Sequence, residues 1–155
     1  MFQVGDKVFY PMHGASVIEA IEEKEILGIK RPYYVMTIRG MQVMFPIESK
    51  LGIRPVVDLD ILEDVITTLN QGESDLNLNP NQRYRNNMSK MKSGDIYQGA
   101  QVIRDLIRLG KKKTLAVGDK AMLDNAQQIL LSELALVKGI AQEQAIDLLN
   151  EVIDS

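Results

Sequence analysis

The hydrophobic period of this chain changes at about residue 57, and the change divides its 155 residues between two kinds of structure. Before that point, short runs of β-type residues at 7–10, 16–26, 33–38 and 42–45 are separated by glycine and proline. About five short strands in so short a stretch predict an antiparallel sheet curled into a small SH3-like or Tudor-like barrel with exposed strand edges. After Pro55 the apolar residues recur at helical spacing. We therefore expect an α+β fold with a β-barrel domain at 1–55 and an α-helical bundle at 56–155.

The helical part carries capping and breaking signals along its length. Asp58, Asn79 and Asp95 each precede an apolar pattern of helical spacing and are predicted N-caps. The polar residues at 70–79 predict a flexible loop. The five expected helices follow Asp58, run from Pro80 to Gly94, follow Asp95, run from about Gly118 to Val137, and cover a short final segment from Ala141 to Val152.

Composition excludes several classes of function. Apolar residues make up 45% of the chain and charged residues 25%, which is ordinary for a soluble globular protein. No apolar run approaches the roughly 18 residues of a membrane span, and the first residues carry no signal-peptide core, so we expect a cytoplasmic protein without membrane contact. With no cysteine and with His13 as its one histidine, a single chain can form neither a disulfide nor a Cys/His zinc site.

No side chains form a recognisable catalytic pattern. A nucleophile beside a base, a pair of carboxylates and a glycine-rich phosphate loop are all missing from the sequence. His13, between proline and glycine, is interpreted as a turn residue. We therefore expect no enzyme activity, no metal and no cofactor.

Charge is distributed unevenly along the chain. Residues 76–120 hold ten Lys or Arg against three Asp or Glu, a net charge of +7, whereas the segments on either side are each at −5. A basic block of this kind is an electrostatic footprint for phosphate, and a solvated helix face is the alternative interpretation.

A series of motifs connects the two halves. Near the start stand Gly5-Asp6, an alternating run and Pro11-x-His13-Gly14, and Val43-Met-Phe-Pro46 follows. The helical half continues with the segments 83–95, 102–106 and 122–135. Taken in this order, nearly the whole chain resembles the CarD-like bacterial transcription regulators, a family that binds RNA polymerase.

The resemblance implies a polymerase contact made by the barrel. In the family, this domain binds the RNA polymerase β subunit by setting strand edges together, and exposed edges can supply such main-chain pairing. The family's contact positions fall here on Lys24, Ile26 and Met44. The alternative is that these residues only complete the surface of the barrel.

The resemblance also implies a DNA contact made by the helices. The family usually places a tryptophan at the start of its first DNA-facing helix, where it wedges into the minor groove at the upstream edge of the promoter bubble. This chain has no tryptophan, and the matching position is Pro80. Proline can act as an apolar wedge, or it can serve only as the first helical residue.

Basic side chains at helical spacing provide the other expected DNA contacts. Arg104, Arg108 and Lys111 or Lys112 are expected to form one stripe, and Arg83 and Lys90 to share a face of the preceding helix. Such stripes suit phosphates and imply no sequence-specific recognition. The complete set of expected DNA contacts is Pro80, Arg83, Arg85, Lys90, Arg104, Arg108, Lys111, Lys112 and Lys120.

These expectations combine into one functional hypothesis. The chain is expected to be a monomeric, non-enzymatic CarD-like regulator that docks on polymerase, associates with the nucleoid through it, and modulates open-complex stability by contacting upstream promoter DNA. Two other classes stay open. A protein-interaction adaptor would bind polymerase without touching DNA, and a free nucleic-acid-binding protein would bind duplex DNA tightly by itself. The acidic ends and the lack of an aromatic platform disfavour the second of these.

Overall fold

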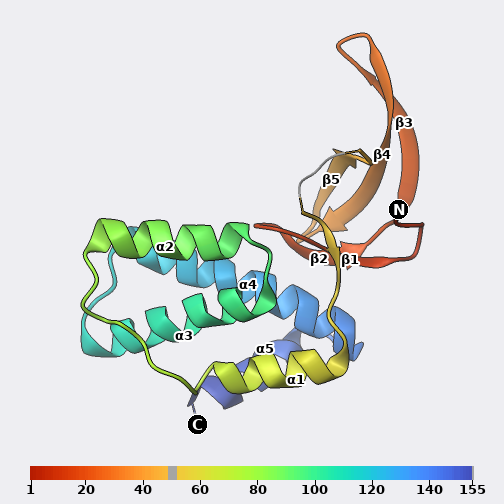
Figure 1. Ribbon diagram of the computed structural model, residues 1–155. Helices are drawn as coiled ribbons and strands as arrows, with labels where there is room; N and C mark the ends of the chain where they lie inside the picture. Colours follow the sequence, from red (N-terminus) through yellow and green to blue (C-terminus); the bar gives the residue numbers. More distant parts are fainter. Residues whose placement is uncertain (49–51, 155) are drawn as a thin grey trace.

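The computed structural model describes residues 1–48 and 52–154, which form six strands followed by five helices (Figure 1). The strands are β1 (Lys7–Tyr10), β2 (Gly14–Val17), β3 (Ala20–Ile26), β4 (Ile29–Ile38), β5 (Met41–Pro46) and β6 (Arg54–Pro55). The helices are α1 (Leu59–Thr68), α2 (Pro80–Lys92), α3 (Ile96–Lys112), α4 (Val117–Lys138) and α5 (Gln142–Asp154). The mixed α+β class is therefore confirmed. None of the described helices is long and apolar enough to cross a membrane.

The strands form two antiparallel three-stranded sheets, with the orders β2-β1-β6 and β3-β4-β5, and the described residues close no barrel. The predicted SH3-like or Tudor-like barrel is not confirmed, and the expected strand at 16–26 changes partner in its middle. Ile18 N donates to Asp6 O in the first sheet, and the next amide, Glu19 N, donates to Val35 O in the second. The same chain thus serves both sheets in turn, and each sheet keeps free edges.

The first sheet is covered on both faces. Val8 belongs to a core cluster with Ile18, Met36 and other residues of the second sheet, whereas the adjacent Phe9 belongs to the core of the helices. Neighbouring side chains on a strand point to opposite faces, so β1 contributes to two cores at once. The sheets and the helical bundle are therefore packed against each other through β1 and β2.

An ion pair between β6 and α4 strengthens this junction. The Arg54 guanidinium donates two hydrogen bonds of 2.8 Å to the Glu133 carboxylate, which also accepts a bond of 2.9 Å from Val57 N. Glu133 is fully buried, and Arg54 lies over the Phe9 ring at 4.2 Å from its centroid. The point where the chain leaves the sheets is thus tied directly to the longest helix.

The helices begin where their caps predict. The side chains of Asp58, Asn79 and Asp95 accept backbone hydrogen bonds at the starts of α1, α2 and α3, and Gly139 ends α4 with a positive φ of 65°. These signals are local, which is why the sequence could predict them. The final helix, α5, begins one residue after the expected start at Ala141 and ends two residues after the expected end at Val152.

Candidate functional site

A two-stranded arm projects from the second sheet (Figure 1). β5 pairs with β4 between Tyr33 and Ile38, and Ile47 N adds one bond to Pro32 O, so the described residues of β4 before Pro32 pair with β3 alone. The arm turns at Leu27 and Gly28, both with positive φ, the conformation of a two-residue hairpin loop that matches strand twist. All residues from 21 to 32 are exposed. The arm is therefore held out into solvent with the outer edge of β3 unpaired among the described strands.

The arm carries two of the three predicted polymerase contacts. The Lys24 ammonium lies 3.5 Å from the Glu22 carboxylate, and both side chains are about half exposed. Ile26 lies beside the tip, where Leu27 is 96% exposed and Ile29 is 52% exposed. Leu27 and Ile29 were not among the predicted contacts. The sequence signal was present, because Ile26 and Ile29 flank a Leu-Gly turn.

The third predicted polymerase contact lies on the other edge of the same sheet. Met44 is half-buried in β5 and pairs with Val35 of β4, whereas Lys24 pairs with Arg31. Val35 and Arg31 are an even number of residues apart on β4, so Met44 and Lys24 lie on one face of the sheet. The structure places them on opposite edges of that face, with β4 between them.

The predicted DNA contact Arg83 does not lie on an exposed face. It is 8% exposed, and its Nη2 donates a bond of 2.8 Å to Asp119 Oδ2 of α4. The pair links α2 to the start of α4. An ion pair of this kind fixes the orientation of the two helices, and the positive charge of Arg83 is already balanced by Asp119.

The first member of the expected basic stripe on α3 is also buried. Arg104 is 9% exposed, and its two terminal nitrogens donate to the carbonyl oxygens of Gln71 and Glu73. Arg108 Nη1 donates to Gly72 O at 2.8 Å and to the Ser74 hydroxyl. Both arginines hold the 70–79 loop against α3, because backbone carbonyls in that loop need donors.

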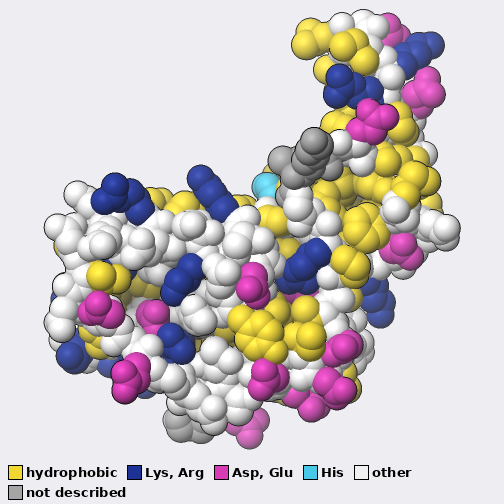
Figure 2. Space-filling view, viewed as in Figure 1, with side chains coloured by type: hydrophobic (Ala, Val, Ile, Leu, Met, Phe, Trp, Pro, Cys, Tyr) yellow, Lys and Arg dark blue, Asp and Glu magenta, His cyan; other side chains and the backbone are white. Residues whose placement is uncertain are grey.

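The other predicted DNA contacts, apart from Lys90, are exposed. One end of the bundle, away from the sheets, brings together the first turn of α2, the last turn of α3 and the start of α4 (Figure 1). Lysine and arginine side chains stand out on the helical surface in Figure 2. Lys113 lies at this end, and Lys92 is exposed near the C-terminus of α2. Neither was among the predicted DNA contacts, although both belong to the basic block at 76–120. The predicted residues at this end are Pro80, Lys111, Lys112 and Lys120, whereas Arg85 lies near the middle of α2 and Lys90 is half-buried between α2 and α3.

Pro80 occupies the first position of α2, and Asn79 accepts a capping bond of 2.8 Å from Asn81 N. One turn later, the Tyr84 side chain is 42% exposed and its ring lies against Gly118 at the start of α4. An aromatic side chain is therefore present close to the position where the resemblance implies a wedge.

Two further residues, His13 and Tyr97, have defined hydrogen bonds outside these surfaces. His13 is exposed, its amide donates to Tyr10 O, and its ring lies 4.5 Å from the Tyr10 ring, as a turn residue would. The Tyr97 hydroxyl donates to Asp64 Oδ2, and this bond, with desolvation and nearby carboxylates, raises the pKa of Tyr97 above its ordinary value of 10.0. Among the described residues, no group of three His, Cys, Asp or Glu side chains could hold a metal ion.

Comparisons with known proteins match both halves of the chain. A family model described as "CarD-like/TRCF RID domain" matches residues 2–57, and one described as "CarD, C-terminal domain" matches residues 64–150. A protein of Bacillus subtilis (strain 168) named "Putative transcription factor YdeB" is 50% identical over 148 residues, which cover 93% of this chain and 97% of that protein.

Proposed function

Because the chain belongs to the CarD family of transcription factors, we propose that it is a non-enzymatic regulator that docks on the RNA polymerase β subunit and contacts upstream promoter DNA. The docking surface is the outer edge of β3 with the arm tip. The DNA surface is the basic end of the helical bundle. The two surfaces lie on different parts of the molecule, so both partners can be bound at once.

The observation that carries the polymerase contact is the unpaired edge of β3 on a projecting arm. A strand added to such an edge gains main-chain hydrogen bonds, and side chains on alternate positions supply selectivity. Lys24 and Ile26 point to the same face of β3, since they are two residues apart. Exposed Leu27 adds apolar area at the tip, which a partner would bury.

The DNA contact rests on the exposed cations at the far end of the bundle. Lysines and arginines around a helix end bind phosphates without reading bases, so the contact is expected to be independent of sequence and sensitive to salt. In the folded chain this role belongs to Lys111, Lys112 and Lys120, with Arg85 near the middle of α2, because Arg83 and Arg104 are buried in internal contacts. Pro80, or Tyr84 one turn later, would provide the apolar side chain at the edge of the bubble.

Docking and DNA contact act together in this mechanism. A protein bound to polymerase presents its second surface to nearby DNA at a high effective concentration, so weak phosphate contacts are sufficient to bias promoter opening. Promoters limited by different steps respond in opposite directions, which makes one chain an activator at some promoters and a repressor at others.

An adaptor that binds polymerase without DNA is the second candidate. It is favoured by the internal hydrogen bonds of Arg104 and Arg108, which remove two cations from the predicted stripe. The two candidates differ in one measurement. A regulator loses its effect on promoter-complex lifetime when the exposed lysines of the basic end are neutralised, whereas an adaptor keeps it.

The test of the docking surface uses full-length protein and immobilised RNA polymerase. Lys24→Glu and Leu27→Asp are each expected to weaken binding on the order of tenfold, because they place the wrong charge or a charge without a partner in the contact. Lys138→Glu, the same change of charge on α4, is the matched control and should leave affinity unchanged. Wild-type affinity for both arm variants would contradict the assignment of the arm.

A further inference from the structure

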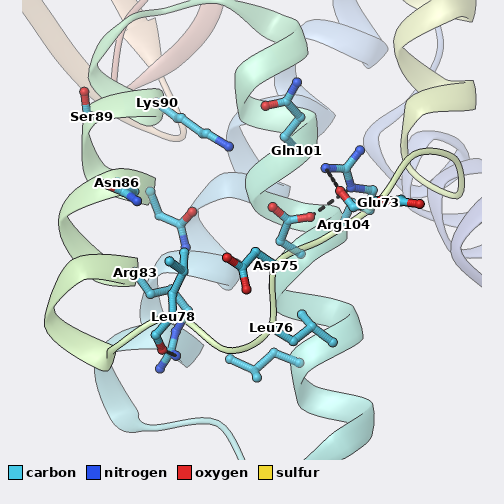
Figure 3. A pocket seen from close by; sticks show the side chains of 13 residues that line it. Glu73, Asp75, Leu76, Leu78, Arg83, Asn86, Ser89, Lys90, Gln101 and Arg104 are labelled. Carbon is cyan, nitrogen blue, oxygen red and sulfur yellow. Dashed lines mark hydrogen bonds and ion pairs between the residues drawn. The ribbon is translucent and has the colours of Figure 1, made fainter.

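A polar groove lies between α2, α3 and the 70–79 loop (Figure 3). Its volume is about 680 Å³, within the range of small-molecule sites. Leu76, Leu78 and Leu109 provide apolar lining, and the remaining lining residues are polar or charged. A groove of this size and chemistry is suited to a small polar molecule.

The loop that forms one wall is held in place before any ligand binds. Arg104 and Arg108 donate to the backbone carbonyls of residues 71–73. The Ser74 hydroxyl bonds to Asp105 of α3. A wall fixed by side chains of the neighbouring helix pays less ordering entropy on binding than a free loop would.

Two buried donors on the α2 wall have no hydrogen-bond partner within the described part of the chain. They are Arg83 Nε and Asn87 Nδ2, and their residues are 8% and 5% exposed. Both residues line the groove. A buried donor without an acceptor carries a desolvation penalty that an acceptor placed in the groove would remove. The α2 wall therefore favours a carboxylate or carbonyl oxygen.

The charges of the groove are divided between its walls. Arg83 and Arg104 are compensated by Asp119 and Asp105. Among the described residues, Lys90 on α2 and the two loop carboxylates Glu73 and Asp75 make no ion pair. Figure 3 shows Lys90 reaching from α2 toward α3 and Asp75 projecting from the loop into the space between them. Among residues 1–48 and 52–154, Lys90 is thus an unpaired cation on one wall, and the loop on the other wall carries the carboxylates of Glu73 and Asp75, of which Asp75 also accepts a bond of 3.0 Å from Asn77 N.

From this arrangement we propose that the groove binds a basic amino acid, with its carboxylate on the α2 wall and its two cationic groups toward the loop. The carboxylate accepts from Asn87 Nδ2 and Arg83 Nε and lies near the Lys90 ammonium. The amino group and the side-chain cation meet Asp75 and Glu73. A highly phosphorylated nucleotide is excluded by the two carboxylates, since like charges repel in a partly desolvated site. The proposal does not depend on the proposed function.

Titration of full-length, ¹⁵N-labelled protein with L-arginine tests the site directly. The side-chain amide signal of Asn87, assigned by its loss in Asn87→Leu, is expected to shift saturably. L-alanine lacks the second cation and guanidinium chloride lacks the carboxylate, so each should bind roughly tenfold or more weakly. Equal affinity for arginine, alanine and glutamate, or no saturable shift with arginine, would overturn the proposal.

Variants separate this site from nonspecific binding. Asp75→Asn and Lys90→Met are each expected to weaken arginine binding by about tenfold. Asp124→Asn on α4 and Lys92→Met on α2 make the same chemical changes outside the groove, and they should bind arginine as the wild type does. Unchanged arginine affinity in both groove variants would place binding elsewhere.

Discussion

Glu133→Gln tests the junction between the sheets and the helices. The substitution keeps the shape of the side chain but removes the charge of a fully buried carboxylate that accepts three hydrogen bonds. One amide oxygen cannot serve two guanidinium nitrogens and the Val57 amide as well, and the new NH₂ group would face donors. Breaking a buried ion pair by changing one partner costs about 3–5 kcal/mol.

The cost should fall at the low end of that range, because Arg54 is not stranded by the change. Its side chain is 23% exposed, its Nε still donates to Gly94 O, and Nη1 still donates to Pro55 O. We therefore expect a loss of about 3 kcal/mol in the free energy of unfolding. With a urea slope of about 2 kcal/mol/M, the unfolding midpoint should fall by about 1.5 M.

Urea unfolding followed by circular dichroism measures this loss, and a double-mutant cycle assigns it. Arg54→Met, Glu133→Gln and the double variant should show a coupling energy of at least about 1 kcal/mol, since the two groups are in direct contact. Glu143→Gln on the exposed start of α5 is the matched control and should change stability by less than about 0.5 kcal/mol. A loss below about 1 kcal/mol for Glu133→Gln, or a coupling energy near zero, would refute the reasoning.

Three further predictions concern the DNA-facing end and one titrating group. Neutralising the exposed lysines of the basic end should reduce the slope of log K against log salt concentration by up to about 3 in DNA binding measurements, because each phosphate contact releases counterions. An unchanged slope would mean that these lysines only solvate the surface. The variant carries alanine at Lys111, Lys112 and Lys120. Pro80→Trp should lengthen promoter-complex lifetime and Tyr84→Ala should shorten it, because an apolar wedge holds an unstacked base step. Asn79 still caps α2 in the Pro80→Trp variant. A shorter lifetime for Pro80→Trp with the fold intact would assign Pro80 to helix initiation alone. Because the pKa of Tyr97 is raised in the folded protein, its hydrogen bond to Asp64 contributes stability below the unfolded pKa of about 10, and this contribution is lost as pH rises through the folded pKa. Unfolding curves of Tyr97→Phe, measured across alkaline pH, should therefore lack this loss of stability.

Sequence reasoning succeeded where the determining interaction is local. Asp58, Asn79 and Asp95 bond to amides two or three residues further along, and such bonds need no knowledge of the fold. The change of period after Pro55 is equally local, and it predicted the order of strands and helices. The family resemblance was confirmed for the same reason, since it depends on motifs in linear order.

Sequence reasoning failed where the interaction partner lies far along the chain. Nothing between Ser16 and Ile26 signals that the strand leaves one sheet for another at Ile18, because the change is set by Asp6 and Val35. Arg104 has the spacing of a surface cation, yet the two carbonyl oxygens that its terminal nitrogens bind lie more than 30 residues earlier in the chain.

The junction carries a signal that could have been used. Glu133 stands among Leu130, Leu131 and Leu134, all of which are buried. A charged residue within such a run requires a buried partner of opposite charge. The identity of that partner could not be predicted, because Arg54 is 79 residues away in the sequence.

The junction also bears on how the two proposed surfaces act together. α4 is 22 residues long, which at 1.5 Å per residue gives a rod of about 33 Å. One part of this rod packs on β2 and binds Arg54, and its N-terminus lies at the basic end of the bundle. A stiff connection fixes where the lysines lie relative to the docked arm, whereas a loose one spreads the same charges over a larger volume and lowers their effective concentration at the DNA. Loosening the junction should therefore reduce the effect on promoters even when the polymerase contact and the DNA contact, each measured alone, keep their affinities.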